Sequence, residues 1–188
     1  MPSSKATRLF DRVDRLEYQL CQQVNSTLRF RPVHGYFALV SRLGDGWFWY
    51  AQILTLPFLG MPRGLPLALT LTATGAAGSL LYKVLKQYLV RERPFISFPA
   101  IHCGTPPLDR YSFPSGHSLH AVAFTTVLAL TMPVLALGIL PFTLSVMGSR
   151  IVLGLHYPTD VLAGAMIGMV LGLLSDACLL PELVTALG

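Results

Sequence analysis

Charged side chains are scarce in this sequence and absent from long parts of it. Of the 188 residues, 12% are Asp, Glu, Lys or Arg, whereas 53% are hydrophobic. Residues 46–62, 64–82 and 111–149 contain none of the four charged types, and 151–175 contain only Asp160. The longest of these stretches has 39 residues, enough for two membrane crossings of about 17–25 residues each. This composition argues against an ordinary soluble domain and predicts an integral membrane protein.

Cysteine is also rare, and the basic residues are unevenly placed. Cys21, Cys103 and Cys178 are far apart and show no paired spacing, so we expect no disulfide framework. Of the 14 Lys and Arg residues, against nine acidic ones, seven lie within residues 1–42 and five within 83–110. This clustering favours a basic segment at a membrane surface and an anion site over binding of nucleic acid.

Hydrophobic patterning predicts an all-α fold, a polytopic bundle of transmembrane helices. We expect spanning helices over 46–62, 65–85, 116–132, 134–150 and 157–177, in one domain of residues 1–188 whose transmembrane core is 46–177. Gly44-Asp45-Gly46 should interrupt the chain before the first span, and five prolines predict an irregular loop over 91–114. The pattern gives five spans, or six if residues 27–43 also cross.

The N-terminal segment, residues 1–43, carries many of the charges. Within 7–28, Leu9 and Leu16 share one helical face and Arg8 lies on another, which predicts an amphipathic helix in the membrane interface. An amphipathic helix packed on the domain is the alternative. The basic residues predict a cytoplasmic N-terminus. Five spans would then give a cytoplasmic site, and six a periplasmic one.

Three polar strings stand out against this apolar background. They are Lys86 with Arg93-Pro94, then Pro114-Ser115-Gly116-His117, then Ser149-Arg150 with His156 and Asp160. After Arg110, the remaining 78 residues contain one basic side chain, Arg150. Because charge is costly inside a membrane, residues of this kind are usually retained for function.

The first two strings each have a functional and a structural interpretation. Lys86 and Arg93 are two helical turns apart and could form a pair of cations, or could both extend to the membrane surface. The string ending in His117 should begin a helix that Ser115 caps and whose free N–H groups attract an anion. A simple capping turn is the alternative.

The third string suggests nucleophilic chemistry. His156 and Asp160 share one helical face, so the carboxylate can orient the imidazole, or the two can simply form a buried polar pair. Two histidines, three cations, a helix N-terminus and a carboxylate at one membrane face suit phosphoryl transfer. In that reaction, the cations hold phosphate oxygens, one histidine attacks phosphorus and the other protonates the leaving alkoxide. A zinc site using His120 or His102-Cys103 lacks regular ligand spacing.

The joint pattern resembles the type 2 phosphatidic acid phosphatase (PAP2) superfamily of integral membrane lipid phosphatases. Over residues 86–160 the sequence follows that family's spacing: Lys, six residues and Arg-Pro; then Pro-Ser-Gly-His; then Ser-Arg, five residues, His, three residues and Asp. The resemblance implies that His156 is the nucleophile forming a phosphohistidine, with Asp160 as its partner, and that His117 is the general acid and base. The phosphate-binding residues it implies are Lys86, Arg93, Ser115, Gly116 and Arg150. It also implies catalysis without a metal or other cofactor, and usually six spans.

The function we expect is hydrolysis of a phosphomonoester or pyrophosphate on a lipid. Candidate substrates are phosphatidic acid, phosphatidylglycerophosphate and undecaprenyl pyrophosphate. The compact size resembles bacterial members, so we expect a multi-pass protein of the bacterial inner membrane whose partners are its lipid substrate and membrane lipids. A lipid phosphotransferase using the same phosphohistidine is one alternative. A transporter with Arg150, His156 and Asp160 along a polar path is another. The sequence does not determine the oligomeric state.

Overall fold

The computed structural model describes residues 5–59 and 63–187, with side chains from Val13 onward. Its helices are α1 (Lys5–Asn25), α2 (Arg31–Arg42), α3 (Phe48–Leu59), α4 (Gly64–Tyr88), α5 (Pro94–Ser97), α6 (Gly116–Thr131), α7 (Pro133–Val152), α8 (Pro158–Cys178) and α9 (Leu180–Leu187). The described ranges contain no β-strand, so the all-α prediction is confirmed. The end of the predicted span 46–62, residues 1–4 of the N-terminal segment, and the side chains of Arg8 and Leu9 lie outside this description.

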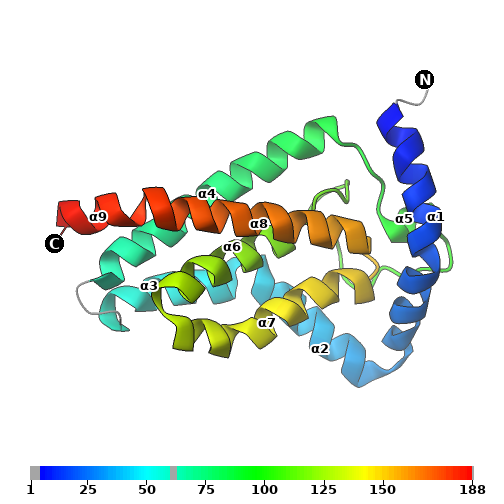
Figure 1. Ribbon diagram of the computed structural model, residues 1–188. Coiled ribbons are helices and arrows are strands. Elements are labelled where there is room, and N and C mark those ends of the chain that lie inside the picture. Colours follow the sequence, from blue (N-terminus) through cyan, green and yellow to red (C-terminus); the bar gives the residue numbers. More distant parts are fainter. Residues whose placement is uncertain (1–4, 60–62, 188) are drawn as a thin grey trace.

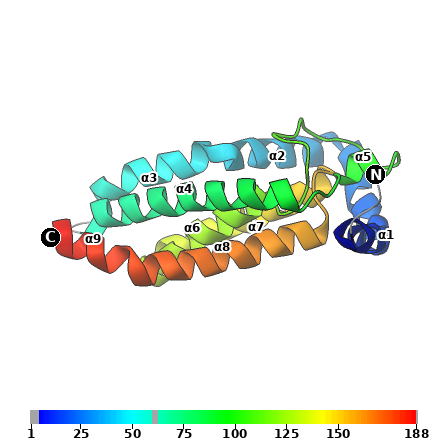
Figure 2. The same ribbon diagram turned by 90° about the horizontal axis from the view of Figure 1, so that it is seen from above.

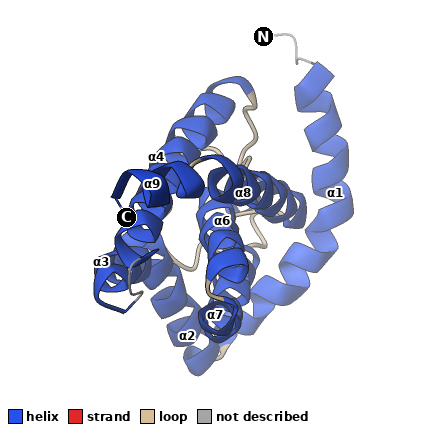
Figure 3. Cartoon of the chain, turned by 60° about the vertical axis from the view of Figure 1, so that its left-hand side comes forward, coloured by secondary structure: helices blue, strands red, loops and turns tan. Residues whose placement is uncertain are grey.

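The long helices lie side by side in an elongated bundle (Figure 1, Figure 2). A view along the bundle shows α6 with α4, α7 and α8 around it (Figure 3). Helix α1 lies across one end, and α9 lies at the opposite end (Figure 1). Consecutive long helices alternate in direction, so α4 and α7 end, and α6 and α8 begin, at the end where α1 lies. We call this the α1 end, and all three polar strings meet there.

Many large apolar side chains of α7 and α8 face outward. Val134, Leu144, Leu162 and Met166 are 84%, 58%, 58% and 65% exposed. Among the described residues, three helical stretches are long and apolar enough to cross a membrane: Gly64–Tyr88, Pro133–Val152 and Pro158–Leu187. An apolar exterior of this kind fits contact with lipid, where helices satisfy their own backbone hydrogen bonds. The predicted membrane-crossing character is therefore confirmed, while the number of spans stays a prediction.

Helices α6 and α8 approach until their backbones touch. A Cβ atom added to Gly164 would collide with the carbonyl oxygen of Ser115, and one added to Gly168 would collide with that of Leu119. Small residues permit such close packing between apolar helices, where side-chain burial from water contributes little. The start of α6 is thereby held against the start of α8.

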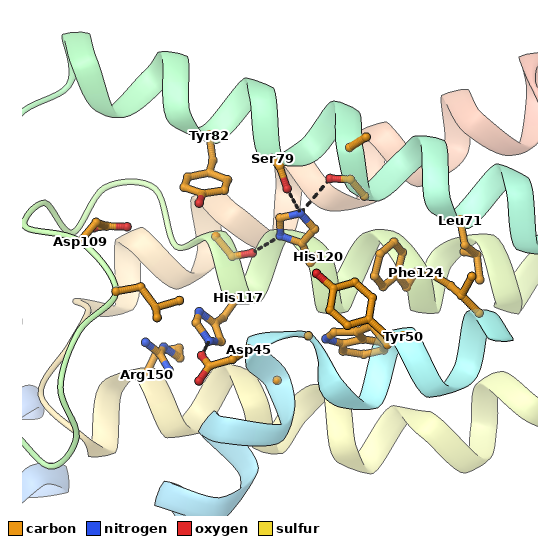
Figure 4. Close-up of a pocket in the computed structure, with 18 of the residues that line it drawn as sticks. Asp45, Tyr50, Leu71, Ser79, Tyr82, Asp109, His117, His120, Phe124 and Arg150 are labelled. Atoms are coloured by element: carbon orange, nitrogen blue, oxygen red, sulfur yellow. Dashed lines mark hydrogen bonds and ion pairs between the residues drawn. The ribbon is translucent and has the colours of Figure 1, made fainter.

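The chain before the first predicted span is more helical than we expected. Residues 31–42, for which we predicted no helix apart from a possible sixth span over 27–43, form α2, and the turn Leu43–Trp47 joins α2 to α3. Gly46 has φ 143°, a value that side-chain-bearing residues rarely adopt, so the chain bends here and then resumes a helix. The predicted interruption at Gly44-Asp45-Gly46 is thus confirmed as a bend. The bend places Asp45 beside the start of α6 (Figure 4).

Polar contacts attach helix α1 to the start of α8. Glu17 accepts hydrogen bonds from the backbone N–H of Thr159, at 2.7 Å, and from its hydroxyl, at 2.8 Å. Cys21 is fully buried in a small apolar cluster with Ile101 and Tyr157. The helix therefore packs on the bundle, as the alternative interpretation expected. Its placement in the membrane interface stays a prediction.

Candidate active site

A cavity of about 670 Å³ lies at the α1 end, between α3, α4, α6 and the loop that precedes α6. Six residues of the three strings line it: Lys86, Arg93, Gly116, His117, Arg150 and His156. Apolar side chains of α3, α4 and α6 continue the wall away from the charged end, including Trp49, Leu71 and Phe124 (Figure 4). The cavity therefore has a cationic head and an apolar body, as an amphiphilic ligand with an anionic headgroup requires.

The turn after α7 carries His156 back beside Arg150. The backbone N–H groups of Leu155 and His156 both donate to the carbonyl oxygen of Arg150, each at 3.0 Å. Gly154 makes this reversal possible, because it has φ 72° and its Cα faces the carbonyl oxygen of His102, where a Cβ would come within 2.6 Å. The spacing between Arg150 and His156 thus encodes a tight turn.

The ring of His156 lies between Arg93 and Asp160. Nη1 of Arg93 lies 3.2 Å from Nε2, and because a guanidinium can only donate, Nε2 must accept. The ring proton of the neutral tautomer is then on Nδ1, which lies 3.6 Å from Oδ2 of Asp160. Burial, assisted by the positive charges of Arg93 and Arg150, lowers the pKa of His156 well below its ordinary value. At neutral pH, Nε2 is therefore unprotonated, and its lone pair is directed at Arg93.

Asp160 is held by a residue that sequence reasoning did not select. Nη1 of Arg91 donates to Oδ1 of Asp160 at 2.5 Å, and the same guanidinium pairs with Asp14 and Glu17 of α1. The side chain of Arg91 is almost fully buried. Asp160 also accepts from the backbone N–H of Tyr157 at 2.9 Å, which caps α8.

Lys86 and Arg93 meet at a carboxylate on the loop before α6. Nζ of Lys86 lies 2.6 and 2.7 Å from the two carboxylate oxygens of Asp109, and Nη2 of Arg93 lies 2.8 Å from Oδ1. Burial by itself would raise the pKa of Asp109, but its hydrogen bonds and charge attraction to Lys86 and Arg93 lower it below the usual value. The carboxylate is therefore ionised at neutral pH. The expected pairing of Lys86 with Arg93 exists, bridged by a residue that the sequence analysis missed.

His117 has a carboxylate partner of its own. Its Nε2 lies 2.6 Å from Oδ1 of Asp45, at the bend between α2 and α3 (Figure 4). Sequence analysis had treated Asp45 as part of a chain break. The sequence did contain a signal for Asp45, because acidic residues are as scarce in this chain as basic ones and could have been singled out as Arg150 was. The same signal applies to Asp109.

The remaining predicted phosphate ligands differ in position. The guanidinium of Arg150 is buried and donates to the hydroxyl of Ser41 at 2.5 Å, and no described carboxylate forms an ion pair with it. Gly116 lines the cavity at the start of α6. Ser115 is fully buried and caps α6, accepting from the backbone N–H of Ser118 at 3.4 Å and from its hydroxyl at 2.9 Å. The structure thus confirms the cap, while a contact between Ser115 and phosphate stays a prediction.

A zinc site that uses His120 was one of the alternatives considered from the sequence. His120 binds its neighbours through both ring nitrogens, with Nδ1 at 2.8 Å from the carbonyl oxygen of Gly116 and Nε2 at 3.1 Å from Oγ of Ser79 (Figure 4). Within residues 5–59 and 63–187, no three His, Cys, Asp or Glu side chains are grouped so as to hold a metal ion.

Comparison with known proteins gives one family. A model of the PAP2 superfamily matches residues 64–180. Undecaprenyl-diphosphatase of Sulfolobus acidocaldarius is 30% identical over 145 residues, which is 76% of this chain and 69% of that protein. Decaprenylphosphoryl-5-phosphoribose phosphatase of Mycolicibacterium smegmatis is 42% identical over 97 residues, 49% of this chain, so the match spans about half (51%) of that relative's length. The crystal structure of Aquifex aeolicus LpxE superposes with a TM-score of 0.72 at 25% identity, covering 85% of this chain and 94% of that one.

Proposed function

The chain belongs to the PAP2 superfamily, and we propose that it hydrolyses a phosphomonoester or pyrophosphate of a membrane lipid through a phosphohistidine on His156. The observation that carries this proposal is the orientation of His156. Its unprotonated Nε2 faces a cationic pocket that continues into an apolar cavity. A lipid phosphate can place its charged group among the cations and its chain along the apolar wall.

The cations take the phosphate oxygens. Lys86, Arg93 and Arg150 bind them, together with the backbone N–H of Gly116 at the start of α6. Arg150 is the most informative of the three, because a buried guanidinium is costly unless an anion joins it. These contacts draw charge from phosphorus and strengthen as the transition state forms.

Covalent catalysis then proceeds in two displacements. Nε2 of His156 attacks phosphorus, the N–P bond forms, and the bond from phosphorus to the leaving oxygen breaks while His117 gives that oxygen a proton. Water next attacks the phosphohistidine, gives its proton to His117, and the N–P bond breaks to release phosphate. Asp160 stabilises the positive ring of His156 through its Nδ1–H side.

The same proposal includes the setting of the enzyme. We infer a multi-pass protein of the bacterial inner membrane. Helix α1 would lie at the membrane surface, and the cationic head of the cavity would lie near the lipid headgroups. The relatives named above act, by their names, on undecaprenyl diphosphate and on decaprenylphosphoryl-5-phosphoribose. These names support keeping a polyprenyl-linked phosphate, beside phosphatidic acid and phosphatidylglycerophosphate, among the substrates to test.

Phosphate release tests the proposal. The purified protein in detergent with EDTA is given phosphatidic acid, phosphatidylglycerophosphate or undecaprenyl pyrophosphate, with His156→Ala as the control. Release that requires His156 and survives EDTA supports the proposal, and relative rates rank the substrates. If none of these lipids releases phosphate, but radioactive phosphate moves from one lipid to another, the protein is a phosphotransferase and the proposed hydrolysis is wrong.

A further inference from the structure

Asp109 sits where its carboxylate bridges two of the cations assigned to substrate. Both of its oxygens contact Nζ of Lys86, and Oδ1 also contacts Nη2 of Arg93. Lys86 and Arg93 are buried, whereas the Asp109 side chain is 36% exposed at the rim of the cavity (Figure 4). The geometry matches that of an external oxyanion: two oxygens held by an ammonium and a guanidinium.

A phosphate group that binds these cations must first displace the carboxylate. A side chain tethered next to its partners competes at a high effective concentration, since it loses no freedom of translation on binding. A ligand with one negative charge makes about the same contacts to Lys86 and Arg93 as the Asp109 carboxylate does, so displacing the carboxylate adds little binding free energy. A ligand with two or more charges also engages Arg150, which Asp109 does not contact, and so gains more.

The displacement needs movement of a side chain alone. Nε of Arg93 donates to the carbonyl oxygen of Asp109 at 3.0 Å, and Nζ of Lys86 donates to that of Tyr111 at 2.9 Å. These backbone contacts keep the loop and both cations in place when the carboxylate rotates outward. The loop therefore remains a wall of the cavity in either arrangement.

We propose that Asp109 is a specificity-determining residue, a tethered carboxylate that keeps singly charged phosphodiester headgroups off Lys86 and Arg93 and yields to doubly charged phosphomonoesters and pyrophosphates. A lipid bilayer offers phosphodiester headgroups in great excess over any phosphomonoester substrate. Without such a competitor, these phosphodiester lipids would occupy Lys86 and Arg93. The inference rests on the proposed phosphatase function and deepens it, because it states how the same site selects its substrate class.

Competition by phosphatidylglycerol, a singly charged phosphodiester, tests the proposal. Its inhibition constant is measured in mixed micelles against hydrolysis of phosphatidic acid, for the full-length protein and for Asp109→Asn. We expect the inhibition constant to fall about tenfold in the variant, the order expected for release of one charge-assisted hydrogen bond. The KM for phosphatidic acid should change less. Asp109→Ser repeats the test should Asp109→Asn fail to fold.

Two matched variants separate this role from other effects of charge. Glu92→Gln removes an exposed carboxylate that pairs with Arg110 and not with the cavity cations, so its inhibition constant should stay at the wild-type value. Asp109→Glu keeps the charge and should keep the discrimination. An unchanged inhibition constant in Asp109→Asn overturns the proposal. So does a rise in both constants, because Asp109 would then hold the cations in position for every ligand.

A binding measurement distinguishes this proposal from the proposed function. Inorganic phosphate at a fixed concentration stabilises the protein against heat more strongly the more tightly it binds, with no turnover. Asp109→Asn should bind phosphate more tightly than wild type, by less than the tenfold change expected for the singly charged phosphodiester. If wild type hydrolyses no lipid, the proposed function fails while this comparison still tests Asp109. If wild type hydrolyses lipid and the variant binds phosphate no more tightly, only the role of Asp109 is wrong.

Discussion

Nε2 of His117 lies 2.6 Å from Oδ1 of Asp45, and this contact joins the start of α6 to the bend between α2 and α3. Because a carboxylate can only accept, the proton of that bond is on Nε2 of the histidine. Asp45 thereby fixes the tautomer of the proposed general acid and stabilises its charged form.

Asp45→Asn should slow turnover of lipids whose leaving group is a poor alkoxide by about 10- to 100-fold, because general acid catalysis supplies a rate factor of this order. An activated aryl phosphate, which departs without a proton, should be affected much less. The measurement compares kcat for the two kinds of substrate. In a His117→Ala background, the Asp45 substitution should have no further effect. Equal losses on both substrates would show that Asp45 supports the fold and not the proton transfer.

Arg91 joins α1 to Asp160, so its substitution should lower both stability and activity. Arg91→Gln leaves Asp14, Glu17 and Asp160 without their shared cation, and breaking a buried ion pair costs about 3–5 kcal/mol. Thermal unfolding in detergent should show a large drop in midpoint. Arg110→Gln is the control, since Arg110 is exposed and pairs with Glu92 at 3.5 Å, a contact that contributes about 0–1 kcal/mol. Similar midpoints for the two variants would contradict the account.

The depressed pKa of His156 sets the direction of the pH dependence. A neutral imidazole is the nucleophile, and its pKa lies below the ordinary 6.5, so kcat/KM should hold steady as pH falls through 6.5 and decline only at lower pH. The ionisation of the substrate phosphate is measured separately by ³¹P NMR and divided out. The unfolded chain takes up this proton at higher pH than the folded one, so folding stability should also decrease as pH falls below 6.5. A decline of kcat/KM centred above 6.5 would contradict the assignment.

The contact between α6 and α8 should tolerate no side chain at Gly168. An added Cβ meets the carbonyl oxygen of Leu119, which belongs to helix backbone and cannot rotate away. Gly168→Ala should therefore destabilise the protein by about 1–3 kcal/mol, the usual cost of overpacking, and reduce activity by moving the start of α6. Gly138→Ala in α7 is the matched control. A Cβ there meets nothing within 4 Å, so the substitution should be neutral or stabilising. Thermal inactivation in detergent compares the two.

The parts of the site that the sequence predicted are those set by local geometry. Arg150, His156 and Asp160 are joined by one turn and one helix start, and the string ending in His117 carries its own cap. Hydropathy located α4, α6, α7 and α8 within a few residues, because charged residues in them are few and lie near the helix ends.

The parts that were missed depend on contacts between distant segments. Arg91 and Asp14 are 77 residues apart, and His117 and Asp45 are 72 apart, so nothing in the local sequence pairs them. The sequence analysis did not predict helix α2, because Arg31, Pro32 and Arg42 enclose only a short apolar run. Pro32 nevertheless suits the first turn of a helix. These pairings depend on how distant segments pack in the fold, and a local sequence pattern carries no information about that packing.

Trapping the covalent intermediate tests the central claim most directly. Wild-type protein is mixed with ³²P-labelled lipid phosphate, quenched in alkali within milliseconds and digested, and the labelled peptide is sequenced by mass spectrometry. The account predicts an acid-labile, alkali-stable phosphate on His156 that is absent from His156→Ala and accumulates in His117→Ala with an activated substrate. Phosphate on another residue, or a labelled enzyme that persists in His156→Ala, would contradict it.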